Sequence, residues 1–348
     1  MAGIFKNGVW SMGFDMDPLA SQVFTITPAG SMSNSVTPFG FGYSWNTGSG
    51  NNAGISLNTN LVTLIHGIRF HWPSLPGTNV IVFDWHDLTA GATQVTLRVN
   101  AAGAFQFYLG NGTGTPLGPA SASGIATINT WIYIECKVTI SPTVGVVECR
   151  INGNSTPIIS ATGLNTQNTA NTFLNALFVP SPASASNYDD WYMLDTTAAA
   201  PLNTYLGNVQ VRGNAPNANS ANGARNAWMP TNPQNVNWQN VGNIPINAAQ
   251  FNADSTAGDY DMFRFPLIPA SAVFFVNEWV QVELDSAGAR TVALNCTSGG
   301  VDSLGAAFTP PTGAPSLVNQ PYVVDPNTSA AWTVAAASAA EFGLKVVT

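Results

Sequence analysis

Charged residues are scarce in this sequence. Only 8% of its 348 residues are Asp, Glu, Lys or Arg, about a third of the share in typical globular domains. The 18 acidic residues outnumber the 10 basic ones, which gives a formal net charge of −8. Nucleic acid and anionic membranes are therefore poor partners, because both bind to clustered Lys and Arg. We still expect the chain to fold, since 45% of its residues are hydrophobic and disordered chains combine low hydrophobicity with high net charge.

Signals for membrane insertion, export and metal binding are also missing. No apolar run reaches the length of about 18 residues that crosses a membrane, and the start, MAGIFKNGVW, lacks the continuous apolar stretch of a signal peptide. We therefore expect synthesis in the cytoplasm without export. The three cysteines, Cys136, Cys149 and Cys296, match no zinc-site spacing, and so small and odd a number does not indicate a secreted disulfide framework.

Short runs of β-branched and aromatic residues, broken by clusters of Gly, Pro, Asn and Ser, extend over almost the whole chain. This pattern predicts an all-β protein built from sandwiches, and only the Ala-rich segment 333–342 favours a helix. Asn is frequent between residues 212 and 254, and Arg225 is the only charged residue inside that segment. We predict a first β domain at 1–211 and a second, smaller β-sandwich-like domain at 212–348 that begins with this Asn-rich linker or loop.

One hairpin can be predicted in register from its charges. Strands at 131–140 and 145–151 are joined by Ser-Pro-Thr-Val, and a turn centred on Pro142 and Thr143 pairs residues whose numbers sum to 285. This register makes one face wholly apolar, whereas a slip by one residue would bury the charges of the slipped strand. The other face then carries two exposed pairs of opposite charge: Lys137 with Glu148, and Glu135 with Arg150.

Two kinds of polar side chain are predicted to lie in the core of the first domain. The hairpin register sets Cys136 directly opposite Cys149 on the apolar face. These thiols are either two small, reduced core residues or a strained cross-strand disulfide, and counting free thiols in the native protein separates the two interpretations. His66 alternates in phase with apolar residues in LVTLIHGIRFHW, so we expect a hydrogen-bonded core residue rather than a metal ligand.

The hairpin and the passages after it resemble a known family. WIYIE at 131–135 followed by GVVECRING at 145–153 is similar to the hairpin of laminin-G-like, concanavalin A-like jelly rolls, and YDDWYMLD at 188–195 is similar to their closing strand. That strand followed by LGNVQV at 206–211 resembles a passage of tailed-bacteriophage structural proteins that carry such a domain. Further similar passages follow in the same order: WMP at 228–230, STAGDYD at 255–261, ARTVAL at 289–294 and EFGLKV at 341–346.

The resemblance implies a concanavalin A-like jelly roll over residues 1–211 and a non-enzymatic structural role in a tailed-phage virion. Such a protein is displayed on the capsid or tail, as a decoration, tail or fibre component, and contacts other virion proteins and copies of itself. It would be made in the cytoplasm of the host bacterium and located in the virion. The alternative is a carbohydrate-binding receptor-recognition module of the virion, with a cell-surface glycan as its partner. One departure is Asn208, where the family often has an acidic residue.

The adjacent carboxylates of Asp189 and Asp190 are the best candidates for metal ligands. In lectin-like relatives, acids near strand ends bind Ca²⁺ through oxygen atoms, so calcium is the one cofactor considered. Neighbouring residues of a strand point to opposite faces, and only one of the two can enter a given site. The alternative is ordinary hydrogen bonding where the strand begins. DWHD at 84–87 matches no metal-site spacing, because ligands so close together on one strand point in different directions.

No sequence pattern supports an enzyme. The chain has no GxSxG, HExxH or P-loop motif. Concanavalin-like glucanases carry E-x-D-x-x-E on one strand, and ELDSAG at 283–288 comes nearest, but Gly288 stands where the second catalytic Glu belongs. Retaining glycoside hydrolysis needs both an acid and a nucleophile. We therefore expect that the protein is not an enzyme.

Aromatic and apolar side chains supply the remaining candidates for binding. Four tryptophans of the first domain either stack on sugars or fill the core: Trp10, Trp45, Trp72 and Trp85. In the Asn-rich segment, four large apolar side chains would be unfavourable if exposed, so we predict that a partner or the second domain covers them. They are Trp228, Met229, Trp238 and Phe251.

Overall fold

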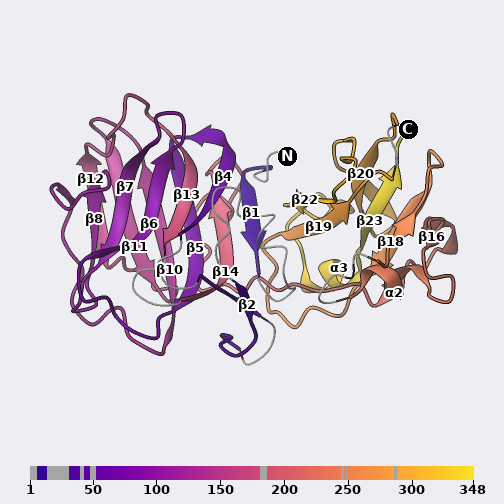
Figure 1. Ribbon diagram of the computed structural model, residues 1–348, viewed down its shortest axis with the longest axis horizontal. Coiled ribbons are helices and arrows are strands. Elements are labelled where there is room, and N and C mark those ends of the chain that lie inside the picture. The colour runs from indigo at the N-terminus through magenta and orange to yellow at the C-terminus, as the bar shows by residue number, and fades with distance from the viewer. Residues whose placement is uncertain are drawn as a thin grey trace. The chain divides into compact units, whose positions relative to one another are not determined.

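The computed structural model consists mainly of β-strands, which confirms the predicted all-β fold. It describes residues 6–13, 31–39, 43–47, 52–180, 186–243, 247, 249–285 and 288–348. The chain folds as two compact units (Figure 1), an N-terminal unit of residues 7–213 and a C-terminal unit of residues 214–348 that also includes Lys6. None of the described helices is long and apolar enough to cross a membrane.

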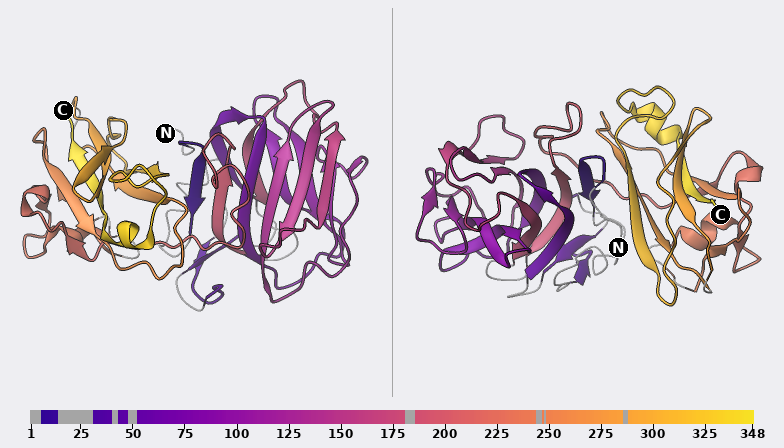
Figure 2. Two further views of the ribbon diagram at one scale, coloured as in Figure 1. Left: turned by 180° about the vertical axis from the view of Figure 1, so that it is seen from behind. Right: turned by 90° about the horizontal axis from the view of Figure 1, so that it is seen from above.

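Two antiparallel sheets pack face to face as the layers of a sandwich in the N-terminal unit (Figures 1 and 2). Sheet A has the strand order β12-β11-β10-β5-β14-β3-β2, with β1 also paired to β14, and sheet B has the order β4-β13-β6-β7-β8-β9. The strands of sheet A are β1 (Val9–Met12), β2 (Ser31–Ser33), β3 (Ser44–Asn46), β5 (Thr63–His71), β10 (Trp131–Thr139), β11 (Gly145–Ile151), β12 (Ile159–Leu164) and β14 (Asn187–Leu194). Those of sheet B are β4 (Asn52–Leu61), β6 (Val80–Asp87), β7 (Ala92–Val99), β8 (Phe105–Leu109), β9 (Pro116–Leu117) and β13 (Leu174–Pro180).

The hydrophobic core of this unit lies between the two sheets and is rich in aromatic rings. Strand alternation places Phe83 and Trp85 of β6 in the core, together with Phe105 and Phe107 of β8, and each of these side chains is fully buried. The interpretation that four tryptophans stack on sugars is wrong, because all four are at most 2% exposed and belong to the core: Trp10, Trp45, Trp72 and Trp85.

Strands β10 and β11 pair in the predicted register, with Cys136 opposite Cys149. Both cysteines are buried and reduced. The expectation of two exposed ion pairs is wrong, although the predicted residues do stand opposite each other. Glu135 is only 1% exposed, and Arg150 makes its ion pair with Glu148 of the same strand, at 2.7 Å between Nε and Oε1. The expectation fails because a distant segment of the chain, described below, covers this part of the face.

His66 lies in the core as predicted, but without the hydrogen bonds that were expected of it. Its ring contacts Phe83 and Trp85, with centroids 4.6 Å and 5.4 Å away. Neither ring nitrogen has a hydrogen-bond partner. Burial disfavours the charged imidazolium and lowers the pKa of His66 to about 3, so this histidine is a neutral packing residue at any physiological pH.

The C-terminal unit contains a five-stranded sheet and two smaller pairs of strands. The five-stranded sheet has the order β15-β18-β23-β20-β21, while β19 pairs with β22 and β16 with β17. Its helix α3 (Val334–Ala339) lies inside the segment predicted to be helical, and Thr333 caps it by accepting a hydrogen bond from the Ala336 amide. The strands are β15 (Ala218–Asn219), β16 (Met229–Pro230), β17 (Asn252–Ala253), β18 (Tyr260–Arg264), β19 (Val276–Val282), β20 (Val292–Ser298), β21 (Val301–Leu304), β22 (Ser316–Tyr322) and β23 (Glu341–Val346).

The Asn-rich segment is folded onto the C-terminal unit rather than extended as a bare linker. It contains β15, the short 3-10 helix η1 (Gly223–Arg225), β16, α2 (Asn237–Val241) and β17. The buried carboxylate of Asp261 accepts hydrogen bonds from the side-chain amides of Asn237 and Asn252, each at 2.7 Å. Burial raises the pKa of Asp261 to about 6, while these amides act to lower it. These asparagines therefore stabilise the segment through hydrogen bonds to a buried carboxylate.

Candidate functional site

The face of sheet B that points away from sheet A carries a row of side chains from four neighbouring strands. Asp84 of β6 stands opposite Phe178 of β13 on one side and Thr96 of β7 on the other. Thr96 in turn stands opposite Tyr108 of β8. Arg98 lies two residues after Thr96 and so projects from the same face. We refer to Asp84, His86, Thr96, Arg98, Tyr108 and Phe178 as the sheet B site.

Simple strand alternation explains why the sequence builds this site. In VFDWHD of β6, Phe83 and Trp85 are buried in the core, which turns Asp84 and His86 outward. In β7, the core residues Val95, Leu97 and Val99 leave Thr96 and Arg98 on the outer face. The polar residues therefore stand on rigid, well-packed strands, which hold a binding site more firmly than loops do.

The carboxylate of Asp84 has one oxygen engaged and one without a partner. Oδ2 accepts a hydrogen bond from the Thr93 hydroxyl at 2.9 Å and lies 3.4 Å from Nδ1 of His86. Oδ1 is buried and has no hydrogen-bond partner. The His86 ring packs edge-on against Phe178, with centroids 5.0 Å apart. A buried acceptor without a partner is unfavourable, so the hydrogen-bonding capacity of Oδ1 is unused in this structure.

The guanidinium of Arg98 likewise has some polar atoms with hydrogen-bond partners and one without. Nη1 donates to the backbone carbonyl of Asn79 at 3.3 Å and Nη2 donates to that of Asn111, but Nε is buried without a partner. Burial lowers the pKa of Arg98, whereas Tyr108 and Asp84 act to raise it. Asn79 also contacts Tyr108, because its side-chain amide donates to the Tyr108 hydroxyl at 3.2 Å. The site thus combines an unpartnered acceptor, an unpartnered donor and aromatic surface.

Asp189 and Asp190, the predicted calcium ligands, are both buried in β14. Oδ2 of Asp190 lies 2.7 Å from Nε of Arg69, and its Oδ1 accepts the backbone amide of Val211 at 2.7 Å. Asp189 Oδ1 accepts the backbone amide of Asp190 at 2.8 Å. No group of three or more His, Cys, Asp or Glu side chains in the described part of the chain could hold a metal ion. Calcium binding stays a prediction, and an ion here would have to displace the guanidinium or the amide.

The segment 206–211, which we call the strap, crosses the outer face of sheet A at this buried ion pair. Arg69 Nη2 donates to Oδ1 of Asn208 at 2.7 Å, so the position where the resembling family often has an acid faces a guanidinium. The amide of Gly207 donates to the Glu135 carboxylate at 2.8 Å, and the Tyr192 hydroxyl donates to the same oxygen. The strap therefore covers Glu135, which the sequence pattern places at the surface.

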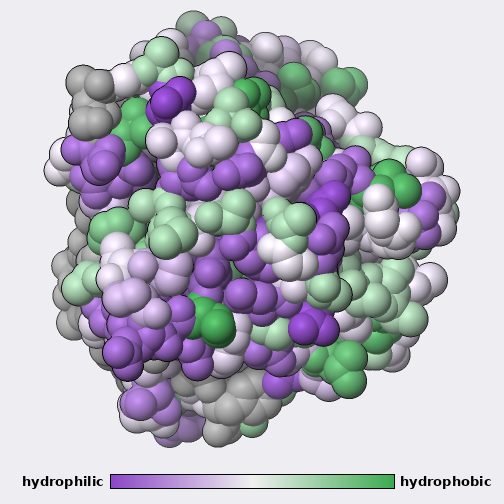
Figure 3. All heavy atoms as spheres, turned by 90° about the vertical axis from the view of Figure 1, so that its right-hand side faces the viewer, coloured by the Kyte–Doolittle hydropathy of each residue, from purple (hydrophilic) through white to green (hydrophobic). Residues whose placement is uncertain are grey.

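The four residues predicted to contact a partner do not share one environment. Trp228 packs against the core residues of the C-terminal unit, and Trp238 is half-buried. Met229 is 71% exposed and Phe251 is 51% exposed. Met229 lies on β16 and pairs with Ala253 of β17, and Phe251 directly precedes β17. On the face of this unit drawn in Figure 3, hydrophobic side chains form small patches among hydrophilic ones.

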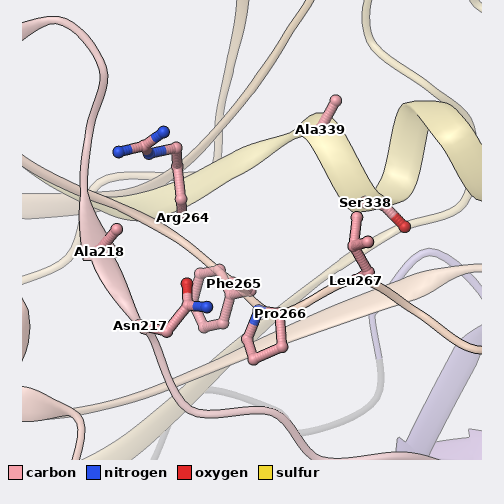
Figure 4. A pocket seen from close by; sticks show the side chains of 8 residues that line it. All are labelled: Asn217, Ala218, Arg264, Phe265, Pro266, Leu267, Ser338 and Ala339. Atoms are coloured by element: carbon pink, nitrogen blue, oxygen red, sulfur yellow. The ribbon is translucent and has the colours of Figure 1, made fainter.

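The C-terminal unit also has an open pocket of about 500 Å³ beside β18 and α3. Figure 4 shows Arg264 and Phe265 near Asn217 and Ala218, with Ser338 and Ala339 contributed by α3. The neighbouring Leu267 is 81% exposed. Arg264 is the only charged residue of the lining, and its Nε donates to the backbone carbonyl of Asn219 at 2.9 Å. The pocket has fewer ligand-directed polar groups than the sheet B site.

Comparisons with known proteins identify similar structures but no family. No protein-family model matches the sequence, and no curated protein matches it. Trypanosoma rangeli sialidase is similar over 48% of this chain, with 14% identity and a TM-score of 0.32, and the chain covers only 27% of the sialidase. The cellulose-induced protein Cip1 is similar over 49% of this chain and 88% of its own, with 11% identity and a TM-score of 0.37.

A third similar structure is the carbohydrate-binding module CBM66 from Bacillus subtilis. It is similar over 48% of this chain and 93% of its own, with 8% identity and a TM-score of 0.31. These similarities concern the fold alone.

The expectation that the protein is not an enzyme is corrected by these comparisons. Sialidases, including a mutant with trans-sialidase activity, are among the similar structures. The lack of a familiar catalytic motif does not by itself exclude an enzyme. The expectation of no enzyme rests partly on ELDSAG at 283–288. This string begins after β19, which ends at Val282, so its first residue lies outside that strand.

Sequence reasoning missed the sheet B site, although its signal was present. DWHD at 84–87 matches no metal-site spacing. A search for metal sites alone therefore overlooks Asp84 and His86 as members of the sheet B site. The alternation of polar with core residues in β6 and β7 would have placed Asp84 and Arg98 on one exposed face. The pairing of β6 with β7 sets Asp84 opposite Thr96 and Arg98 opposite Ile81, so the two charged residues lie diagonally on neighbouring strands.

Proposed function

We propose that the N-terminal unit binds carbohydrate at the sheet B site. The observation that carries the proposal is the pair of buried, unpartnered polar atoms, Asp84 Oδ1 and Arg98 Nε, on neighbouring strands. Sugar hydroxyls both donate and accept hydrogen bonds, so they can satisfy both atoms. The Tyr108 ring adds an aromatic surface of the kind that binding pockets commonly combine with a few fixed polar groups.

Binding of the full-length chain to a panel of immobilised glycans tests the proposed function. We expect retention on a subset of glycans and loss of most of that retention in Tyr108→Ala. The matched control is Phe251→Ala, which removes an exposed aromatic ring from the C-terminal unit. Failure to retain any glycan, or equal loss in the two variants, would contradict the proposal.

The setting of this binding is a separate proposal, namely a tailed-phage virion in which the chain contacts other virion proteins and copies of itself. It is supported by the ordered sequence passages that resemble phage structural proteins. Two of these passages, 188–195 and 206–211, meet where Asp190 accepts the Val211 amide, so their shared occurrence has a structural reason. Synthesis would take place in the host cytoplasm. Mass spectrometry of purified particles tests the proposal, and absence of the chain from them contradicts it.

A further inference from the structure

We infer that the ligand of the sheet B site is a neutral sugar, bound through hydroxyl groups placed between Asp84 and Arg98. This inference rests on the proposed function and adds the chemical class of the ligand. It distinguishes neutral sugars from acidic ones, which carry a carboxylate or a sulfate.

The hydrogen-bonding capacity of the two unpartnered atoms sets the first constraint. Asp84 Oδ1 can only accept a hydrogen bond while ionised, and Arg98 Nε can only donate one. A hydroxyl group does both, so one hydroxyl, or two on adjacent carbons of one ring, can donate to Asp84 and accept from Arg98. An ionised carboxylate or sulfate group can accept from Arg98 Nε but cannot itself donate to Asp84 Oδ1.

The charge balance of the sheet sets the second constraint. The described strands of sheet B hold three formally charged side chains, Asp84, Asp87 and Arg98. Asp87 is buried, and its carboxylate already accepts hydrogen bonds from Thr169 at 2.7 Å and from Asn171 at 2.9 Å. The outer face therefore presents one carboxylate and one guanidinium. An anionic sugar attracted by Arg98 would be repelled by Asp84 on the next strand, so neither sign of ligand charge is favoured.

The surrounding side chains limit how the sugar can lie. Thr96, between the Asp84 and Tyr108 positions in the row, is fully buried, and its hydroxyl donates to the carbonyl of Gly110 at 3.1 Å. The proton of this hydroxyl is therefore not available to a ligand. The sugar is then bounded by Tyr108 on β8 and by the His86–Phe178 pair on β6 and β13, which leaves the Asp84–Arg98 pair as its polar contact.

Competition binding tests the inference. Full-length protein retained on a glycan surface is challenged with neutral oligosaccharides and with matched acidic ones, and we expect only the neutral sugars to displace it. Asp84→Asn and Arg98→Lys should each weaken the affinity by roughly tenfold or more, because each removes a hydrogen bond to a charged group. The control variants Glu283→Gln and Arg264→Lys make the same changes at exposed positions of the C-terminal unit and should bind like the parent.

The outcomes separate the inference from the proposed function. Displacement by acidic sugars alone, or unchanged affinity in well-folded Asp84→Asn and Arg98→Lys, overturns the inference while the protein still binds carbohydrate. Failure of the parent protein to bind any glycan overturns the proposed function as well. Thermal unfolding of each variant shows whether a loss of binding reflects a loss of folding, and Arg98→Gln then supplies a second test at the same position.

Discussion

His66 shows how one buried side chain can set the acid sensitivity of the N-terminal unit. Its pKa is about 3 in the folded protein, whereas the ordinary pKa of a histidine exposed to water, as in the unfolded chain, is 6.5. The unfolded chain therefore binds a proton that the folded chain does not. The stabilising contribution is complete above pH 6.5, and is lost by about 1.4 kcal/mol per pH unit as the pH falls from 6.5 toward 3.

We predict that His66→Leu removes this dependence. Between pH 6.5 and pH 5, the free energy of unfolding of the parent should fall relative to that of the variant by about 2 kcal/mol. Chemical denaturation at the two pH values measures the difference. The control is Ile68→Leu in the same strand, which changes a buried residue that cannot titrate and should keep the pH dependence of the parent. Parallel profiles for the parent and His66→Leu would show that His66 is not the cause.

The cysteines give a second prediction at the scale of single residues. Cys136, Cys149 and Cys296 are all buried and reduced, and burial raises the pKa of Cys136 and Cys296. A buried thiol that stays protonated reacts slowly, because the thiolate is the nucleophile. A thiol reagent should therefore label none of them in the native protein and all three after denaturation. Labelling of only Cys296 after denaturation without reductant would instead indicate a disulfide between the other two.

Among the structural elements, the strap depends on the buried ion pair beneath it. Removing the carboxylate in Asp190→Ala leaves the Arg69 guanidinium buried without its counter-ion. Loss of one partner from a buried pair typically costs about 3–5 kcal/mol, so we predict destabilisation of this size and faster proteolysis within 206–211. Denaturation and limited proteolysis measure the two effects. Asp190→Asn, which keeps an acceptor for the Val211 amide, should be affected less, and equal stability of parent and Asp190→Ala would contradict the role of the pair.

The strap also bears on whether Asp190 is available to bind calcium, because its Val211 amide donates to the Asp190 carboxylate. If Arg69 and the Val211 amide occupy the Asp190 carboxylate, adding Ca²⁺ or a chelator should leave the unfolding temperature unchanged. A rise with Ca²⁺ that Asp190→Ala abolishes would show that the ion replaces these contacts. The measurement is a thermal unfolding curve of the full-length protein at fixed pH and ionic strength.

The elements also show which features follow from sequence. The β10–β11 register was predictable because the turn, the apolar face and the charges all agree on one alignment. The burial of Glu135 was not, because it depends on Gly207, which lies 72 residues away and makes a contact that no local pattern records. The sheet B site falls between these cases: alternation fixes which face Asp84 and Arg98 occupy, but only strand pairing makes them neighbours.

At the scale of the whole molecule, the exposed side chains of the Asn-rich segment allow a test of the proposed virion role. Trp228 is packed in the C-terminal unit, whereas Met229 and Phe251 are exposed and can be changed without opening a core. We predict that Met229→Ser with Phe251→Ser leaves folding intact and lowers incorporation into virus particles, because large buried anchors dominate protein interfaces. Quantitative mass spectrometry of particles made with each variant is the measurement. Unchanged incorporation of the folded variant would rule out this contact.

The central claim for the whole molecule is that the outer face of sheet B binds a neutral glycan. Hydrogen–deuterium exchange of the full-length protein, with and without a neutral oligosaccharide that it retains, tests this claim most directly. We predict slower exchange within β6 and β8, at 80–87 and 105–109, and no change in the C-terminal unit. Protection confined to other segments, such as the strap at 206–211 or the pocket beside α3, would contradict it.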